Sequence, residues 1–329
     1  MSKDPLNLPR CSFCDKVDLP LVAGAGARIC QDCAQTAIRH FSQPPPYRQS
    51  GAVSEVSKAL SGFLGLPTLF GPARKLARHL ASPLNLPLGL LGQRNGMANH
   101  VLIVGPTGSG KTRLALALRK VAPTAIIDVA QMTPAGHDGI SLTATVRALL
   151  RETDGDREKA RYGIVILDNL DSWLFHHPNP HRQNLWWELL MYLEGCNITL
   201  TGKAVLETDN MIFVGLLRSQ TTPKNGKQIQ TLLEQGLPEQ VVARMPLKLF
   251  LESPGPTDIL ALLEKSNSPI FREYKVTQSA RQYLANRAFN LGLGAWGLGH
   301  VLSELDLLIG LEARDPKRID AKFLERRLE

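Results

Sequence analysis

Long apolar runs are absent from this sequence. None of its 329 residues belongs to a stretch approaching the about 18 consecutive apolar residues that a membrane-spanning helix requires. The first ten residues, Met1 to Arg10, also lack the apolar core of a secretory signal peptide. We therefore predict a cytoplasmic protein without a membrane partner.

Acidic residues are scarce in the first hundred positions, which hold 11 Lys and Arg against five Asp and Glu. Most of the formal net charge of +8 therefore precedes residue 101. Aromatic residues are also few, at 6% of the chain, and basic surfaces that bind nucleic acid often interleave aromatic side chains. We favour a solubilising surface and keep nucleic acid or an acidic partner as the alternative.

Internal repeats and low-complexity tracts are absent as well. The length exceeds that of one ordinary hydrophobic core, so we expect two or three domains. Hydrophobic residues make up 43% of the chain, which is ordinary for a soluble protein.

Cysteine is rare, but four of the five cysteines form two Cys-x-x-Cys pairs separated by fifteen residues. This spacing is typical of a tetrahedral zinc ribbon, and a segment of this size is too small to fold on its hydrophobic core alone. Disulfides are the competing interpretation, which a cytoplasmic location disfavours. We predict that Zn²⁺ is bound by Cys11, Cys14, Cys30 and Cys33. The fifth cysteine, Cys196, is expected to be a buried free thiol on a helix.

A glycine-rich loop lies between the apolar run Val101 to Val104 and an Ala- and Leu-rich stretch that predicts a helix. It has the pattern G-x-x-x-x-G-K-[ST], in which backbone amides surround phosphates, the lysine contacts the β and γ phosphates and the hydroxyl binds Mg²⁺. A chance glycine-rich turn is the alternative, which the strand before the loop and the helix after it disfavour. The predicted nucleotide-binding residues are Gly105, Pro106, Thr107, Gly108, Ser109, Gly110, Lys111 and Thr112.

Strand and helix patterns alternate from Val101 to about residue 250, which predicts an α/β domain with a parallel sheet covered on both faces. After Pro254 the strand pattern stops, and amphipathic helices predict a small helical domain. The expected strands are Val101–Val104, Ala125–Val129, Ile164–Leu167 and Met211–Leu216. The expected helices are Leu142–Arg151, Leu185–Leu193, Asp258–Lys265, Gln278–Ala288, Leu298–Leu308 and Ala321–Leu328, with Glu152–Lys159 as a solvated connection.

Asp168 ends the apolar strand Ile164–Leu167, 57 positions after Lys111. A carboxylate in this position is the expected partner of a nucleotide-bound Mg²⁺. A surface aspartate that simply closes a core strand is the alternative. The phosphate loop upstream in the same sheet favours the functional interpretation.

Four segments in order together resemble the ClpX family of AAA+ unfoldases, over nearly the whole chain. They are the ribbon that begins Cys11-Ser12-Phe13-Cys14, the loop Gly105–Thr112, the run Arg161–Asp171 and the segment Gly236–Pro246. The resemblance implies a zinc ribbon at 1–42, a linker at 43–60, an AAA+ large α/β ATP-binding domain at 61–252 and a small helical AAA+ domain at 253–329.

The resemblance also implies ATP, Mg²⁺ and Zn²⁺ as cofactors, and a hexameric ring with nucleotide between neighbouring subunits. It places Arg244 as the arginine finger that reaches a neighbour's γ-phosphate during hydrolysis. The ribbon is expected to dimerise and to receive protein clients or adaptors.

The chain departs from that family at four places. Asn169 replaces the glutamate that activates the attacking water, and an amide cannot readily accept a proton. Trp296 and Gly299 replace two nucleotide-sensing arginines, unless His300 or Arg281 compensates. In the pore loop, His137 and Asp138 replace an aromatic and an apolar residue. The stretch 219–230 is short and has no Ile-Gly-Phe loop for the ClpP peptidase, which makes ClpP docking doubtful.

We therefore predict a zinc- and ATP-binding, ring-forming ClpX-like protein with weakened hydrolysis, which acts on protein clients as a remodelling or nucleotide-gated binding module. It forms either a homo-oligomer or a mixed ring with a homologue. The alternatives are a fully active ATP-dependent unfoldase and a nucleic-acid-binding AAA+ protein.

Overall fold

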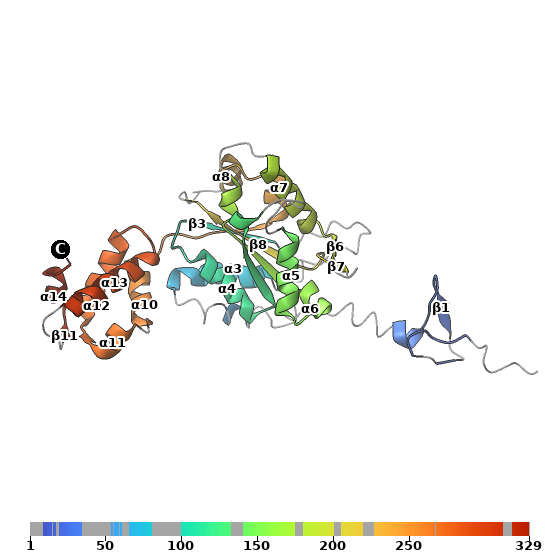
Figure 1. The fold of residues 1–329 in the computed structure, drawn as a ribbon, viewed down its shortest axis with the longest axis horizontal. Helices are drawn as coiled ribbons and strands as arrows, with labels where there is room; N and C mark the ends of the chain where they lie inside the picture. The colour runs from blue at the N-terminus through green and yellow to red at the C-terminus, as the bar shows by residue number, and fades with distance from the viewer. Residues whose placement is uncertain are drawn as a thin grey trace, which may run out of the picture. The chain divides into compact units, whose positions relative to one another are not determined.

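The computed structural model describes residues 9–14, 16–17, 20–34, 54, 56–58, 60, 66–80, 100–132, 141–174, 180–200, 205–219, 227–266, 268–311 and 318–328. The chain divides into two compact units, residues 1–45 and 46–329 (Figure 1). The domain boundaries expected near residues 42, 60 and 252 stay predictions.

The first unit contains a short antiparallel hairpin, made of β1 (Leu21–Ala23) and β2 (Arg28–Cys30). Leu21 pairs with Cys30 in its register. The amide of Gly24 donates to the carbonyl of Ala27, at 2.8 Å, and closes the turn. The hairpin thereby holds Cys30 beside the loop that carries the first cysteine pair.

The second unit is built on a five-stranded parallel sheet with strand order β4-β5-β8-β3-β9. The strands are β3 (Val101–Gly105), β4 (Thr124–Asp128), β5 (Ile164–Asp168), β8 (Ile212–Arg218) and β9 (Leu247–Phe250). Because all five run the same way, their carboxyl ends meet at one edge of the sheet, where ligands bind in open α/β sheets. Gly105, Asp128, Asp168 and Arg218 lie at that edge.

The four predicted strands are confirmed. The fifth strand, β9, was missed because its four residues, Leu-Lys-Leu-Phe, are too few to give a clear strand pattern. The predicted strand Ala125–Val129 ends one residue early. Its last residue begins the 3₁₀ turn η6 (Val129–Gln131), which the side chain of Asp128 caps by accepting from the Ala130 amide at 3.0 Å.

Helices cover both faces of the sheet, and alternate residues of each strand enter one of two buried cores. Leu102 and Val104 of β3 face one core, and Val101 and Ile103 face the other. The first core is packed by α5 (Thr143–Glu152), α7 (Pro180–Leu193) and α9 (Glu239–Arg244). The second is packed by α3 (Phe70–Leu80) and α4 (Lys111–Leu116), followed by η5 (Ala117–Lys120).

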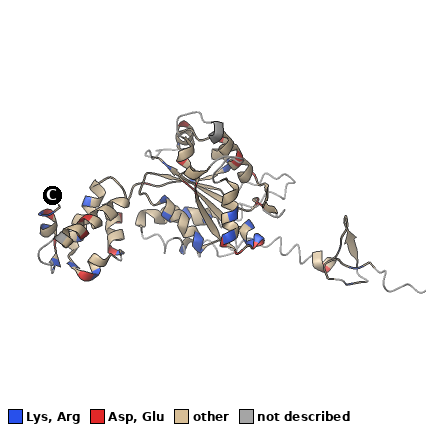
Figure 2. Cartoon of the chain, in the orientation of Figure 1, with Lys and Arg blue, Asp and Glu red and all other residues tan. Residues whose placement is uncertain are grey.

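The basic helix α3 shows how the charge in the front part of the chain is accommodated. Its apolar residues Ala73, Leu76, Ala77 and Leu80 are buried, at the spacing of one helical face. The basic residues between them, at 74, 75 and 78, are exposed. Lys and Arg are blue on this helix and its neighbours in Figure 2. The charges of α3 therefore face solvent.

His100 is a buried polar residue directly before β3. Its Nδ1 accepts from the Phe213 amide at 3.1 Å, and its Nε2 lies 3.0 Å from the carbonyl of Leu193. Because Nδ1 accepts, Nε2 carries the proton, and the neutral ring joins β8 to the end of α7. Burial lowers the pKa of His100 to about 4.

Two expectations in the sheet domain were wrong. The charged segment Glu152–Lys159 contains more than a connection, because Asp156 caps the short helix α6 (Arg157–Arg161) through the Lys159 amide at 3.1 Å. Cys196 is half-buried in the loop after α7, and its amide donates to Thr208 at 2.9 Å. That loop precedes the hairpin of β6 (Asn197–Thr199) and β7 (Val205–Glu207).

The C-terminal helices have a core of their own, as predicted. They are α10 (Pro256–Glu264), α11 (Pro269–Glu273), α12 (Gln278–Asn290), α13 (Trp296–Leu311) and α14 (Ala321–Glu325). The short α11 was missed. So were the two-residue strands β10 (Lys275–Val276) and β11 (Arg318–Ile319), which pair in parallel and correct the expectation that strands stop after Pro254.

Asp258 connects α10 to the sheet domain. Its carboxylate accepts from the Gly255 amide at 3.0 Å, which begins the helix, and from the Thr68 amide of η3 (Pro67–Leu69) at 3.2 Å. The sheet domain also contains α8 (Gln228–Glu234) and the 3₁₀ turn η7 (Leu170–Leu174). Among the described helices, none has both the length and the apolar character to cross a bilayer.

Candidate functional site

A cavity of about 920 Å³ opens at the carboxyl edge of the sheet. Its walls come from the phosphate loop, the ends of β5 and β8, the end of α10 and the start of α13. The polar residues that line it include Lys111, Thr112, Asp168, Asn169, Asp171 and Arg218.

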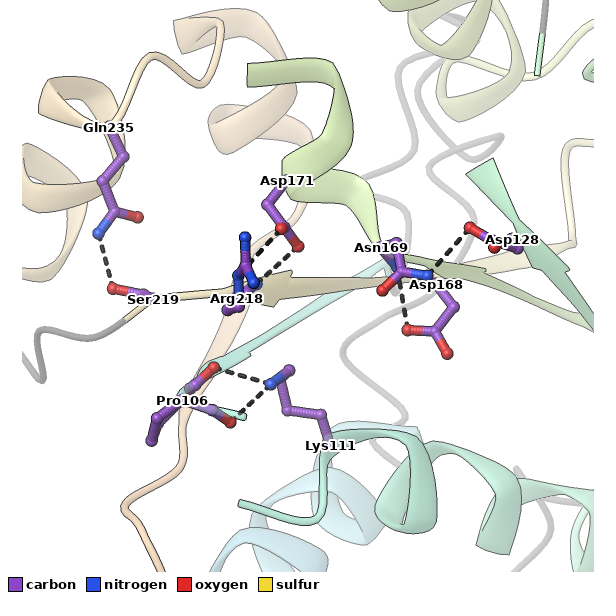
Figure 3. A network of polar contacts seen from close by, with 10 residues as sticks. Pro106, Lys111, Asp128, Asp168, Asn169, Asp171, Arg218, Ser219 and Gln235 are labelled. Carbon is purple, nitrogen blue, oxygen red and sulfur yellow. Dashed lines mark hydrogen bonds and ion pairs between the residues drawn. The ribbon is translucent and has the colours of Figure 1, made fainter. Parts of the chain in front are cut away.

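The predicted phosphate loop connects β3 to α4 in this cavity. Gly108 has φ of +75°, a left-handed conformation that glycine adopts without steric cost. The Lys111 ammonium donates to the carbonyls of Gly105 and Pro106, both at 2.8 Å (Figure 3). Burial lowers the pKa of Lys111, while Asp171 and Asp168 act in the opposite direction. The ammonium therefore lies over its own loop, where phosphate oxygens could replace the two carbonyls as acceptors.

Thr112 and Asp168 meet across the cavity from different elements. The Thr112 hydroxyl donates to Oδ2 of Asp168 at 3.3 Å. A hydroxyl and a carboxylate are hard oxygen ligands of the kind that Mg²⁺ prefers beside nucleotide phosphates. The two residues that the sequence assigned to Mg²⁺ are thus neighbours.

Asn169, directly after β5, has an uncommon backbone conformation with φ of +59°. Its backbone amide donates to Oδ1 of Asp168 at 2.9 Å, and its side-chain Nδ2 donates to Oδ1 of Asp128 at 3.0 Å (Figure 3). Because a carboxylate only accepts, the Asn169 nitrogen faces Asp128 and its oxygen faces away. Sequence analysis missed Asp128, although a carboxylate at the end of a strand was a signal that could have identified it.

Arg218 and Asp171 form a second pair that sequence analysis missed. The Arg218 amide donates to Oδ1 of Asp171 at 3.0 Å, and its Nε lies 3.4 Å from Oδ2 (Figure 3). Both side chains line the cavity, and the Arg218 side chain is 54% exposed. An arginine at the end of β8 has no motif of its own, so only the sheet register identifies it.

The first residues of α13 and the turn before them close one side of the cavity. The Ala295 amide donates to the carbonyl of Gly108 at 3.1 Å, so the α12–α13 turn contacts the phosphate loop directly. Trp296 lines the cavity and is 68% exposed. The helical part also contributes Leu262, Lys265, Ser266 and Leu298, so its wall combines the Trp296 indole with apolar side chains, a hydroxyl and a cation.

The four predicted zinc ligands in the first unit come together. All four sulfurs of Cys11, Cys14, Cys30 and Cys33 lie within 4.8 Å of one another, and those of Cys14 and Cys30 are 3.8 Å apart. Four sulfurs at about 2.3 Å from one ion in tetrahedral geometry are about 3.8 Å apart. The Cys30 amide also donates to the Cys11 sulfur at 3.3 Å. The cluster fits a zinc ribbon, and all four cysteines are free of disulfides.

No protein-family model matches the chain. Curated proteins named as the ClpX ATP-binding subunit of the ATP-dependent Clp protease do match it. The one from Azotobacter vinelandii is 24% identical over 91% of this chain and 85% of its own length. The protein from Treponema denticola is 24% identical over 92% of this chain and 89% of its own length. The protein from Bacteroides fragilis is 23% identical over 97% of this chain and 95% of its own length. The chain is a divergent ClpX-like protein. Its parallel sheet, helical part and Cys₄ cluster accordingly have the α/β AAA+ architecture with a zinc ribbon.

In this ClpX-like chain, Arg244 stands apart from the cavity residues. It ends α9, forms an ion pair with Glu194 and donates through Nη1 to the carbonyl of Gln240 at 3.2 Å. Its side chain is 37% exposed. An arginine that serves a neighbouring subunit's nucleotide would have to leave Glu194.

Arg281 and His300, which the sequence offered as replacements for the two arginines that the resemblance implies, are not among the described residues that line the cavity. The Arg281 guanidinium lies over the Phe271 ring, 4.7 Å from its centre. The predicted pore-loop residues His137 and Asp138 and the segment 220–226 lie outside the described residues.

Proposed function

We infer that this chain binds ATP with Mg²⁺ in the cavity at the carboxyl edge of the sheet and hydrolyses it slowly. The curated relatives are named as ATP-binding subunits, which supports the choice of nucleotide. The observation that carries the inference is that Lys111, Thr112 and Asp168 line one cavity. The residue after Asp168, which also lines it, is Asn169.

The chemistry of each residue follows from its position. Lys111 neutralises phosphate charge, while Thr112 and Asp168 would hold Mg²⁺, which supplies further positive charge when bound. Asn169 can orient a water molecule through its amide oxygen, but it cannot take the proton of that water. Binding is thus retained, and the step that breaks the γ-phosphate bond lacks its base.

We further infer that the Cys₄ cluster holds Zn²⁺ and that the chain works in a hexameric ring, alone or mixed with a homologue. In such a ring Arg244 would exchange Glu194 for a neighbour's nucleotide. The clients would be proteins or adaptors received by the zinc ribbon, and the action remodelling or nucleotide-gated binding. Docking on the ClpP peptidase stays doubtful, because no Ile-Gly-Phe loop occurs in the sequence.

A steady-state ATPase assay of the full chain tests the central claim. We expect Asn169→Glu to raise turnover by about a hundredfold, because a carboxylate then accepts the water proton. Asn169→Gln is the matched control, since it has the length of glutamate without the basic group, and it should leave turnover low.

Two outcomes would contradict the claim. Wild-type turnover equal to that of Asn169→Glu would show that hydrolysis is not weakened. Absence of ATP binding with excess Mg²⁺, measured by calorimetry, would remove the nucleotide site itself.

A fully active unfoldase is the second candidate, favoured by one observation. The Asp128 carboxylate lies 3.0 Å from the Asn169 side chain and keeps a basic group near the water position. This candidate requires ATP-dependent loss of fluorescence from a folded reporter protein, with Asp128→Ala abolishing that loss while ATP still binds.

A further inference from the structure

One end of the cavity suits phosphate. Lys111 and Thr112 follow the phosphate loop, and Asp168 ends β5 beside them. The register of β3 and β8 pairs Gly105, the first residue of that loop, with Arg218. Because the groups that bind a triphosphate and its Mg²⁺ gather here, the base of a nucleotide has to occupy another part of the cavity.

The wall that the helical part provides has a different character. It is formed by the end of α10, the residues directly after it and the start of α13. Its side chains are Leu262, Lys265, Ser266, Trp296 and Leu298. A mostly apolar wall with a few polar groups is typical of sites that bind flat organic molecules, whereas phosphate alone would need only charge.

Trp296 supplies the aromatic ring among the described residues that line the cavity. It is 68% exposed, whereas Leu298, two residues later, is buried in the core of the C-terminal helices. Tryptophan is highly buried on average in folded proteins, so an indole left open inside a cavity offers an unused π face.

The backbone before Trp296 fixes the place of this indole. The Ala295 amide donates to the carbonyl of Gly108 at 3.1 Å, and a Cβ on Gly294 would lie 2.9 Å from the backbone of Gly108. The turn before α13 therefore touches the phosphate loop, and Trp296 begins α13 one residue later. The indole thus borders the space that leads from the loop to the helical wall.

Stacking and phosphate binding would have different consequences for this wall. Every base has a π face, and stacking on an aromatic side chain strengthens binding whatever the number of phosphates. A phosphate contact from the same wall would come from the exposed ammonium of Lys265 and would strengthen binding of any phosphate chain. Ligands with and without a base therefore separate the two contacts.

We propose that the Trp296 indole stacks on the base of the bound nucleotide, so that the helical part recognises the base rather than the number of phosphates. The inference rests on the proposed nucleotide site. It assigns the base to the wall formed by α10 and α13, and it makes Trp296 a specificity-determining residue that favours nucleotides over phosphate chains.

The test compares ATPγS, ADP and inorganic tripolyphosphate, each with Mg²⁺, by calorimetry on the full chain. The decisive variant is Trp296→Leu, which removes the aromatic face and keeps an apolar side chain. The matched control is Trp187→Leu, because Trp187 is a similarly exposed tryptophan on α7, at 61%, and is not among the described residues that line the cavity.

We expect Trp296→Leu to weaken binding of ATPγS and ADP by about tenfold each and to change tripolyphosphate binding by less than about threefold, because tripolyphosphate has no base. Tryptophan fluorescence gives a second readout. ADP should quench the emission of wild type and of Trp187→Leu but not that of Trp296→Leu. Thermal unfolding checks that each variant is folded. If Trp296→Leu is not, quenching of wild type by ADP and not by tripolyphosphate provides the test.

Three results would overturn the inference. Equal weakening of ADP and tripolyphosphate binding in Trp296→Leu would show that the residue acts through the phosphates or their loop. Unchanged affinity for all three ligands would show that the indole does not contact the base. Both results refute stacking and leave the nucleotide site intact. If wild-type protein binds none of the three ligands, the proposed function fails, and the role of Trp296 fails with it.

Discussion

At the residue scale, Asn169 and Asp128 form a pair whose chemistry can be tested without any nucleotide. The side-chain nitrogen of Asn169 and the carboxylate of Asp128 are 3.0 Å apart; Asp128 ends β4, and Asn169 directly follows the neighbouring strand β5. An aspartate at position 169 would place two carboxylates at this distance, where one of them holds its proton to a higher pH than usual.

We predict that Asn169→Asp is destabilised more at pH 8 than at pH 5. The raised pKa means that the native state keeps a proton at low pH and loses stability as the pH rises through that pKa. Thermal unfolding of wild type and Asn169→Asp at both pH values measures this loss of stability. Adding Asp128→Asn to this variant exchanges the positions of the carboxylate and the amide, so only one carboxylate is left, and the pH-dependent loss of stability should disappear. An equal loss of stability at both pH values in Asn169→Asp alone would show that the two side chains do not interact.

His100 gives a second prediction at this scale. Its folded pKa of about 4 is below the ordinary value of 6.5, so the unfolded chain binds a proton first as the pH falls. Its contribution is complete above pH 6.5 and is lost between there and pH 4, by up to about 3 kcal/mol.

Urea unfolding across this pH range, for wild type and His100→Gln, measures that loss by difference. Glutamine can still donate and accept, but it does not titrate. The difference in stability between the two proteins should therefore narrow as the pH falls. A constant difference would contradict the predicted linkage.

At the scale of elements, the turn between α12 and α13 packs against the phosphate loop. A Cβ on Gly294 would lie 2.9 Å from the backbone of Gly108, and one on Gly108 would lie 2.3 Å from the carbonyl of Leu293. The nearby Gly292 also has positive φ, of +67°, but no atom lies within 4 Å of a Cβ placed there.

We predict that Gly292→Ala costs about 1 kcal/mol through backbone strain alone and leaves ADP binding unchanged. Gly294→Ala should cost more and should weaken ADP binding severalfold, because the turn must move off the loop and open the cavity wall. Thermal unfolding and calorimetry compare the two variants. Equal effects on ADP affinity would mean that this contact does not shape the site.

At the scale of the whole molecule, the first unit depends on its cysteines and the second on its three cores. Among the described residues of the first unit, the buried ones are Cys11 and Cys30. A fold of this size requires a metal or a disulfide to compensate for its small core.

We predict that a zinc chelator unfolds the first unit and leaves the second unit's melting transition unchanged. Cys11→Ser should have the same effect without chelator, and Cys196→Ser, outside the cluster, should not. Limited proteolysis reports the unfolding of the first unit, and the zinc content of each protein reports whether the metal is bound. Intact resistance of residues 20–34 to protease in zinc-free protein would contradict the prediction.

Sequence patterns predicted the fold where the cause is local. The apolar runs of β3 and β5, the helical periodicity of the C-terminal part and the spacing of the cysteines each depend on neighbours along the chain. The predictions were wrong or incomplete where the pattern was short or mixed, as at β9, α6 and Cys196. There, a cap such as Asp156 or a place beside an existing strand decided the structure.

By itself, the sequence determined the phosphate loop, the carboxylate that follows β5, the amide at position 169 and the four sulfurs, because each is a motif whose chemistry is contained in its own spacing. Only the tertiary structure decided that Asp128 holds Asn169, and that Arg218 stands beside Gly105 with Asp171 as its partner. These residues belong to strands far apart in sequence, and the register of a parallel sheet, set by its two buried faces, brings them to one edge.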